Sequence, residues 1–206
     1  MKILSLTKKK KHLTEILFED GSLVSVDSEL VEINKLSPGT EVSDTGKLLY
    51  ESDYKRAKSR ALWYLSRSDH SKKALTDKLK KGGFSAQASE DACLRMEELG
   101  LIDDLIYAKR VAEYLSVSGS SKREIAYKLS LKGISSDIIK DILETEESDE
   151  REKIKRLIES KYRNKLSNEK DIQKVFAALI RKGFSYSDVK NALKAYSEEL
   201  ENCEEF

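Results

Sequence analysis

The most chemically suggestive side chains are two adjacent aspartates, Asp103 and Asp104. Paired carboxylates can hold a metal ion or transfer protons, but no third acid or histidine follows them at ligand spacing. They stand just before an apolar helical pattern. We therefore interpret them as a helix N-cap and a first-turn acid, where negative charge suits the helix dipole.

Other reactive residue types also lack partners at useful spacing. Ser68, Asp69 and His70 are adjacent in sequence, and adjacent residues do not form a catalytic triad. The segment Gly119–Lys122 lacks the spacing of a phosphate-binding loop. Cys93 and Cys203 form no CxxC motif, which argues against a zinc site or a disulfide framework. The sequence predicts no catalytic residue, metal or cofactor, and hence a protein that is not an enzyme.

Binding is better supported than catalysis, because positive charge is concentrated in one segment. The whole chain has a net charge of +1, yet residues 55–81 contain only two acids against a dense set of bases: Lys55, Arg56, Lys58, Arg60, Arg67, Lys72, Lys73, Lys78, Lys80 and Lys81. Such a segment can bind nucleic-acid phosphates or an acidic partner, or it can be an ordinary solvated helix face. A second basic segment, residues 151–165, is interleaved with acids and favours a solvated face.

Trp63 is the only tryptophan of the chain. A repeat of 50 residues, described below, aligns it with Glu113 and Arg163, so it does not belong to a core shared by all repeats. It either packs on the N-terminal module or anchors a partner, as exposed aromatic residues often do. Tyr64 and Tyr114 are shared between repeats and are predicted to be core.

The first 50 residues predict a small β-rich module. Two alternating runs flank Asp20-Gly21, which is a strong hairpin signal. Residues 30–36 suit a short helix that must end before Pro38. We expect three or four strands, which need another element to pack against.

The remaining chain repeats with a period of 50 residues. The segment Leu79–Ser85 recurs as Leu129–Ser135 and Leu179–Ser185. In each copy a helix ends at a glycine, Gly83, Gly133 or Gly183, which can adopt the left-handed conformation of a Schellman cap. The following serine caps the next helix, and the middle helices are predicted to begin at the N-caps Ser71, Ser121 and Asp171.

These patterns predict a mostly α fold, with three tandem three-helix repeats in an extended curved array after the β-rich module. The expected boundaries are 1–50 for the module, 51–102, 103–148 and 149–200 for the repeats, and 201–206 for an acidic tail. No apolar run approaches the roughly 20 residues of a membrane helix, so a cytoplasmic protein is expected.

The repeated turns, together with the segment Leu99–Ala108 (LGLIDDLIYA), resemble the RecX family of recombination regulators. The resemblance covers residues 53–200, with a weaker match over the N-terminal strands. It implies a non-enzymatic, cytoplasmic regulator in recombination, DNA repair and the SOS response. It also implies binding to the RecA recombinase filament and inhibition of its activities, with DNA contact in several members.

We therefore expect a monomer whose first repeat binds RecA, DNA or both, through Lys55, Arg56, Arg60, Trp63, Arg67, Lys72, Lys73, Lys80 and Lys81. Two alternatives stay open: a free-standing DNA-binding helical-repeat protein, and a helical scaffold with another protein partner.

Overall fold

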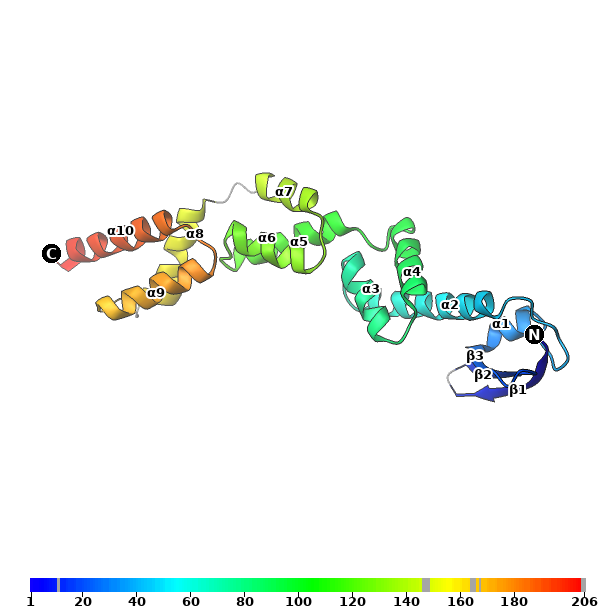
Figure 1. Cartoon of the computed structure of the whole chain (residues 1–206). Coiled ribbons are helices and arrows are strands. Elements are labelled where there is room, and N and C mark those ends of the chain that lie inside the picture. Colours follow the sequence, from blue (N-terminus) through cyan, green and yellow to red (C-terminus); the bar gives the residue numbers. More distant parts are fainter. Residues whose placement is uncertain (11, 146–148, 164–165, 167, 205–206) are drawn as a thin grey trace. The chain divides into compact units, whose positions relative to one another are not determined.

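The computed structural model describes residues 1–10, 12–145, 149–163, 166 and 168–204. The chain forms two compact units, Met1–Asp103 and Asp104–Phe206, and is mostly helical with one small sheet (Figure 1). Parts of three predicted features lie outside the described residues: the repeat boundary at 148, the end of the basic segment 151–165, and the last two residues of the acidic tail.

The first unit begins with a three-stranded antiparallel sheet of order β1-β2-β3, formed by β1 (Ile3–Lys9), β2 (Leu13–Phe18) and β3 (Leu23–Asp27). The turn between β2 and β3 contains Gly21 at φ 81°, as the Asp-Gly signal predicts. Alternation along the strands buries Ile16, Phe18 and Val26, which pack with Val31 of α1 (Ser28–Ile33) and Leu48 of α2 (Thr45–Leu65). The start of α2 thus supplies the surface that this small sheet needs.

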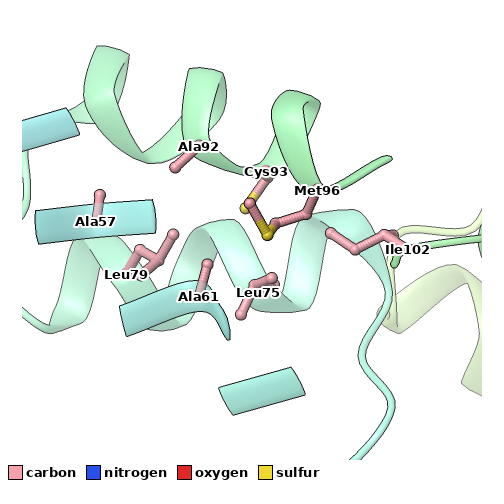
Figure 2. Close-up of a cluster of buried hydrophobic side chains, with 8 residues drawn as sticks. All are labelled: Ala57, Ala61, Leu75, Leu79, Ala92, Cys93, Met96 and Ile102. Carbon is pink, nitrogen blue, oxygen red and sulfur yellow. The ribbon is translucent and has the colours of Figure 1, made fainter. Parts of the chain in front are cut away.

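The helix α2 continues into the first three-helix repeat, with α3 (Lys72–Lys81) and α4 (Ala86–Glu98). Its core combines two alanines of α2 with residues of α3, of α4 and of the segment after α4 (Figure 2): Ala57, Ala61, Leu75, Leu79, Ala92, Cys93, Met96 and Ile102. Alanines four residues apart on α2 lie on one face of the helix, where they let its backbone approach the neighbouring helices closely.

The second unit contains the other two repeats, and each has its own core. Repeat 2 consists of α5 (Asp104–Val117), α6 (Lys122–Leu131) and α7 (Ser136–Thr145). Repeat 3 consists of α8 (Glu150–Leu157), which continues as the π-helix η1 (Ile158–Tyr162), followed by α9 (Glu169–Arg181) and α10 (Tyr186–Glu204).

All three middle helices end in the same glycine turn. The N–H groups of Phe84, Ile134 and Phe184 donate to the carbonyls of Leu79, Leu129 and Leu179 at 3.3, 3.2 and 3.4 Å. The preceding glycines have φ of 90°, 79° and 88°. These are Schellman caps, in which the last residue adopts a left-handed backbone conformation that carries little steric penalty for glycine. The next helix is capped by the Ser85, Ser135 or Ser185 hydroxyl, each accepting from a backbone N–H three residues on.

Repeats 2 and 3 meet at one of these turns. The Ser121 hydroxyl, which caps α6 by accepting from the Glu124 N–H at 3.1 Å, also donates to the Lys182 carbonyl at 2.5 Å. A Cβ added to Gly183 would lie 2.7 Å from this hydroxyl oxygen and 3.1 Å from Cβ of Arg123. One serine therefore caps the start of α6 and the end of α9 at once. We call this contact the serine–glycine joint.

Two helix starts differ from the expectation. The helix α2 begins at Thr45, because the Asp44 side chain accepts from the Lys47 N–H at 2.8 Å, so the predicted boundary at 50 falls inside a helix. The N-cap of α9 is Asn168 rather than Asp171, whose N–H donates to the Asn168 side chain at 2.9 Å. Asp171 lies instead in the first turn, where its charge still suits the helix dipole.

The first helices of the repeats do not follow the 50-residue period. Ala57 and Ala61 of α2 correspond in burial to Ala108 and Ala112 of α5, a shift of 51. Tyr114 is therefore the counterpart of Trp63 rather than of Tyr64. It is 73% exposed, so its assignment to the core was wrong. The period of 50 holds where the turn and the middle helix pack, whereas the connection before the middle helix varies in length.

Candidate partner-binding surface

Two arginines flank Trp63 in the sequence. Arg60 lies three residues before it on the same face of α2. Arg67 lies four residues after it, in the turn that follows the last residue of α2, Leu65. Their guanidinium carbons lie over the Trp63 ring at 5.2 and 4.2 Å from its centre. All three are exposed, Trp63 by 42%, and Trp63 is absent from the core of the N-terminal module. Trp63 instead lines a groove together with residues of the module, so neither of the two predicted roles is decided. We call these three residues the arginine–tryptophan face.

The arginine–tryptophan face borders a groove of about 730 Å³ between α2 and the N-terminal module. Arg56 also lines the groove, with its guanidinium 5.5 Å from the centre of the Phe84 ring. The opposite side contains the acids Asp27, Glu29 and Glu32 of β3 and α1. The groove is therefore cationic and aromatic on one side and acidic on the other.

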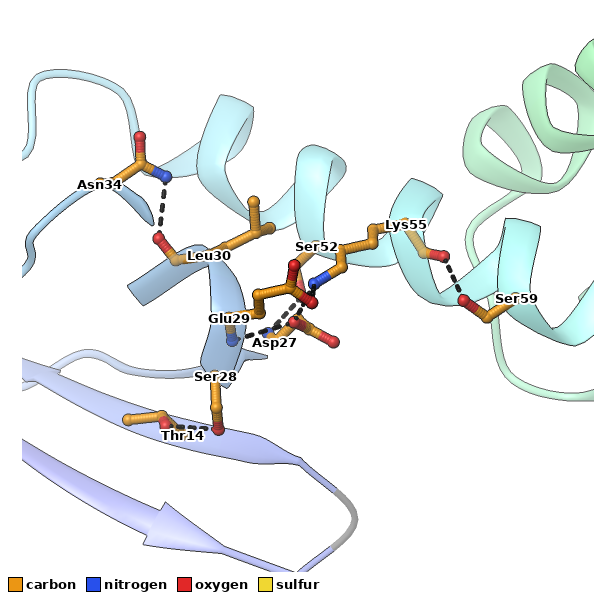
Figure 3. Close-up of polar contacts among 9 residues, drawn as sticks. All are labelled: Thr14, Asp27, Ser28, Glu29, Leu30, Asn34, Ser52, Lys55 and Ser59. Carbon is orange, nitrogen blue, oxygen red and sulfur yellow. Dashed lines mark hydrogen bonds and ion pairs between the residues drawn. The ribbon is translucent and has the colours of Figure 1, made fainter. Parts of the chain in front are cut away.

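Lys55 connects the two sides of the groove rather than facing a partner. Its ammonium group pairs with the Asp27 carboxylate at 2.7 Å and with the Glu29 carboxylate (Figure 3). The Ser52 hydroxyl accepts from the Asp27 N–H at 2.7 Å and adds a second link. Burial works to lower the pKa of Lys55, but its hydrogen bonds to the two acids outweigh this, and its pKa lies above the ordinary value. Lys55 holds the module against α2.

The lysines of α3 are separate from this groove. Lys72 pairs with Glu97 at 2.6 Å, and Lys80 pairs with Glu90 at 2.7 Å, so both contact α4 of their own repeat. Lys73 and Lys81 are exposed. The basic segment thus has two parts. Its arginines lie over aromatic rings beside the groove, and two of its lysines form ion pairs between α3 and α4.

Two further hydrogen bonds position α2 against α4. The sequence did not predict either of them. The Asp53 carboxylate accepts from the Ser85 N–H at 2.7 Å, at the start of α4. The Tyr50 hydroxyl donates to Asp91 of α4 at 2.7 Å. This bond raises the pKa of Tyr50 to about 12 and lowers that of Asp91. Both pairs are more than 30 residues apart in sequence, so periodicity within one helix could not reveal them.

The other chemical candidates have structural explanations. Asp104 begins α5, and Asp103 precedes it. Within the described residues, no group of three or more His, Cys, Asp or Glu side chains could hold a metal ion. Ser120 and Ser121, in the segment that faintly resembles a phosphate loop, are buried, and Ser121 forms the serine–glycine joint. No helix in the described part of the chain is long and apolar enough to cross a membrane.

Comparison with protein families gives two matches. The first and third three-helix domains of RecX match residues 57–96 and 148–193. These ranges correspond to the first and third repeats defined by the glycine turns.

Individual relatives match over most of the chain. A regulatory protein RecX from Caldanaerobacter subterraneus subsp. tengcongensis is 31% identical over 198 residues, 94% of this chain and 98% of the relative. One from Clostridium tetani is 29% identical over 90% of this chain and 89% of its own. A crystal structure of a regulatory protein RecX aligns with a TM-score of 0.62 at 26% identity, over 94% of this chain and 98% of that one. The crystal structure of RecX from Lactobacillus salivarius aligns with a TM-score of 0.58 at 26% identity, over 69% of this chain and 96% of that one.

Proposed function

The chain belongs to the RecX family of regulatory proteins, and on that basis we propose that it binds the RecA recombinase filament and inhibits its activities in recombination and DNA repair. The observation that carries the proposal is the similarity to a regulatory protein RecX along 94% of the chain. It spans the N-terminal module and all three repeats. A cytoplasmic monomer that acts by binding alone, with no cofactor, completes the proposal.

The first unit supports a binding role. Arginine and tryptophan are the residue types enriched at the energetic centres of protein interfaces, and the arginine–tryptophan face exposes both. Among the ion pairs of the described residues, none involves Arg60 or Arg67. Their guanidinium groups are therefore available to carboxylates or phosphates of a partner.

The experiment is an assay of RecA's DNA-dependent ATP hydrolysis with increasing amounts of the purified chain. Inhibition should set in at amounts comparable to RecA. An unchanged hydrolysis rate at stoichiometric amounts would refute inhibition of RecA.

Direct DNA binding is a second candidate, favoured by the same exposed arginines. If Z phosphates are neutralised, the logarithm of the affinity falls with the logarithm of the salt concentration at a slope of about 0.9Z for duplex DNA. Titration of DNA binding against salt distinguishes the two candidates. Weak binding with a shallow slope favours a protein partner, and tight binding with a steep slope favours DNA.

A further inference from the structure

The groove beside α2 has balanced charge, although it lies in the most basic segment of the sequence. Its lining contains three cations, Lys55, Arg56 and Arg60, and three acids: Asp27, Glu29 and Glu32. The acids come from the module and the cations from α2, and Lys55 pairs with Asp27 and Glu29 where the two meet. Such a surface is positive on one side and negative on the other, and its low net charge attracts a polyanion only weakly.

This layout favours a polypeptide over a nucleic acid. A DNA strand that lay along the groove would place phosphates beside Glu29 and Glu32, whose side chains are 65% and 68% exposed. A nucleic-acid site needs a continuous positive surface, because counterion release supplies much of its affinity. A protein segment can instead place an acid toward the arginines and a base toward the glutamates.

The cationic side of the groove is already ordered for binding. The Arg56 guanidinium lies over the Phe84 ring, and the Arg60 guanidinium lies over Trp63. Arginines held on aromatic rings lose less side-chain freedom when they pair with a carboxylate, and their weak hydration makes desolvation cheaper. Trp63, which is 42% exposed, adds a large apolar surface beside Arg60.

The acidic side is held in place from within the unit. Asp27 is bound through its backbone to Ser52 and through its side chain to Lys55 of α2. The module is therefore part of the groove wall, and Lys55 acts as a positioning residue. The groove exists only where the sheet is docked on α2.

We propose that the groove between α2 and the N-terminal module is the docking site for a protein segment that carries an acidic and an apolar side chain toward Arg60 and Trp63 and a basic side chain toward Glu32. This inference rests on the proposed function, since it names the surface through which the protein partner is held. RecA is the partner used to test it.

The test compares variants of the full chain for inhibition of RecA's ATP hydrolysis and for binding of single-stranded DNA. Trp63→Ala and Arg60→Glu should raise the concentration that gives half-maximal inhibition about tenfold or more, as loss of an interface anchor does. Tyr114→Ala is the matched control, because Tyr114 is the exposed counterpart of Trp63 and has Val111 and Ser118 at the positions of Arg60 and Arg67. It should leave inhibition within about twofold.

Glu32→Lys separates the two kinds of partner most sharply. Glu32 makes a single exposed ion pair, with Lys8 at 3.6 Å, so its replacement leaves the fold intact. A protein segment with a base at this position should bind more weakly to the variant, whereas DNA should bind more tightly. Inhibition weakened by Glu32→Lys supports the proposal. Unchanged or stronger inhibition, or DNA binding that rises together with inhibition, overturns it.

Trp63 also reports on DNA directly, because it is the chain's only tryptophan. A base that stacked on it would quench its fluorescence. We expect no quenching by an oligothymidine at physiological salt, and strong quenching would assign the groove to DNA.

A wild-type chain that does not inhibit RecA would refute the proposed function. Inhibition by wild type that Trp63→Ala leaves unchanged would refute only the groove.

Discussion

The two units join their parts in different ways. In the first unit the N-terminal module packs its apolar core on Leu48 of α2 and is linked to α2 further along by charged side chains, Lys55 with Asp27 and Glu29. In the second unit repeats 2 and 3 meet at the serine–glycine joint, where Gly183 leaves no room for a Cβ and Ser121 bonds to a backbone carbonyl. Salt screens and weakens the charged links, whereas a close steric contact is disrupted when a substitution adds side-chain volume.

Gly83 and Gly183 show the difference within one motif. Both follow a middle helix, have nearly equal φ and close the same backbone hydrogen bonds. A Cβ on Gly83 would meet no atom within 4 Å, but one on Gly183 would collide with Ser121. The motif determines the backbone conformation of the turn. The contacts with the neighbouring repeat determine how much additional stability is lost when the glycine is replaced.

The largest effect should come from Gly183→Ala. A left-handed alanine costs about 1–2 kcal/mol, and overpacking against Ser121 adds about 1–3 kcal/mol. Gly83→Ala, the matched control, should lose only the first contribution. Urea unfolding of both variants measures the difference, and equal losses would show that the joint contributes nothing.

Ser121→Ala should have the next largest effect. It removes the α6 cap, worth about 1 kcal/mol, and leaves the Lys182 carbonyl without the hydroxyl donor, which adds about 1 kcal/mol. Ser85→Ala removes a cap of the same kind away from the joint. Thermal unfolding should show about twice the loss for Ser121→Ala, and a loss no greater than that of Ser85→Ala would contradict the double role.

Lys55→Met should destabilise the first unit by about 1 kcal/mol at low salt, because its ion pairs are partly exposed. The loss should shrink as salt is added, since wild type loses the same attraction by screening. Lys8→Met, which removes a more exposed pair, should have almost no effect. A loss for Lys55→Met that does not change with salt would argue against an electrostatic link.

The smallest effect concerns pH and the bond from Tyr50 to Asp91. The folded state stabilises the protonated phenol, since its pKa is raised to about 12. That contribution is full below the ordinary value of 10 and is lost as the pH rises through about 12. Absorbance titration should show one late-titrating tyrosine that returns to the ordinary range in Asp91→Ala. Identical titrations of the two proteins would disprove the bond.

Local signals predicted the turns and the hairpin, because Gly83, Gly133, Gly183 and Gly21 need a backbone conformation that few other residues adopt. The N-cap at Asn168 was missed because Asp171 stands nearby with a similar capping propensity.

For the candidate surface, helical spacing places Arg60 beside Trp63, whereas Arg67 reaches the ring from the turn after α2. The pairing of Lys55 with the module, and the contact of Ser121 with Gly183, could not be predicted, because each joins elements distant in sequence. The 51-residue shift between α2 and α5 was also hidden, since it shows only in which face is buried.

We propose that this chain regulates RecA by binding it. The most direct test of this proposal is the rate of DNA-dependent ATP hydrolysis by RecA as wild-type chain is added. We expect the rate to fall and to level off once the added chain is comparable to RecA. A rate that stays constant through stoichiometric amounts would refute regulation of RecA by binding.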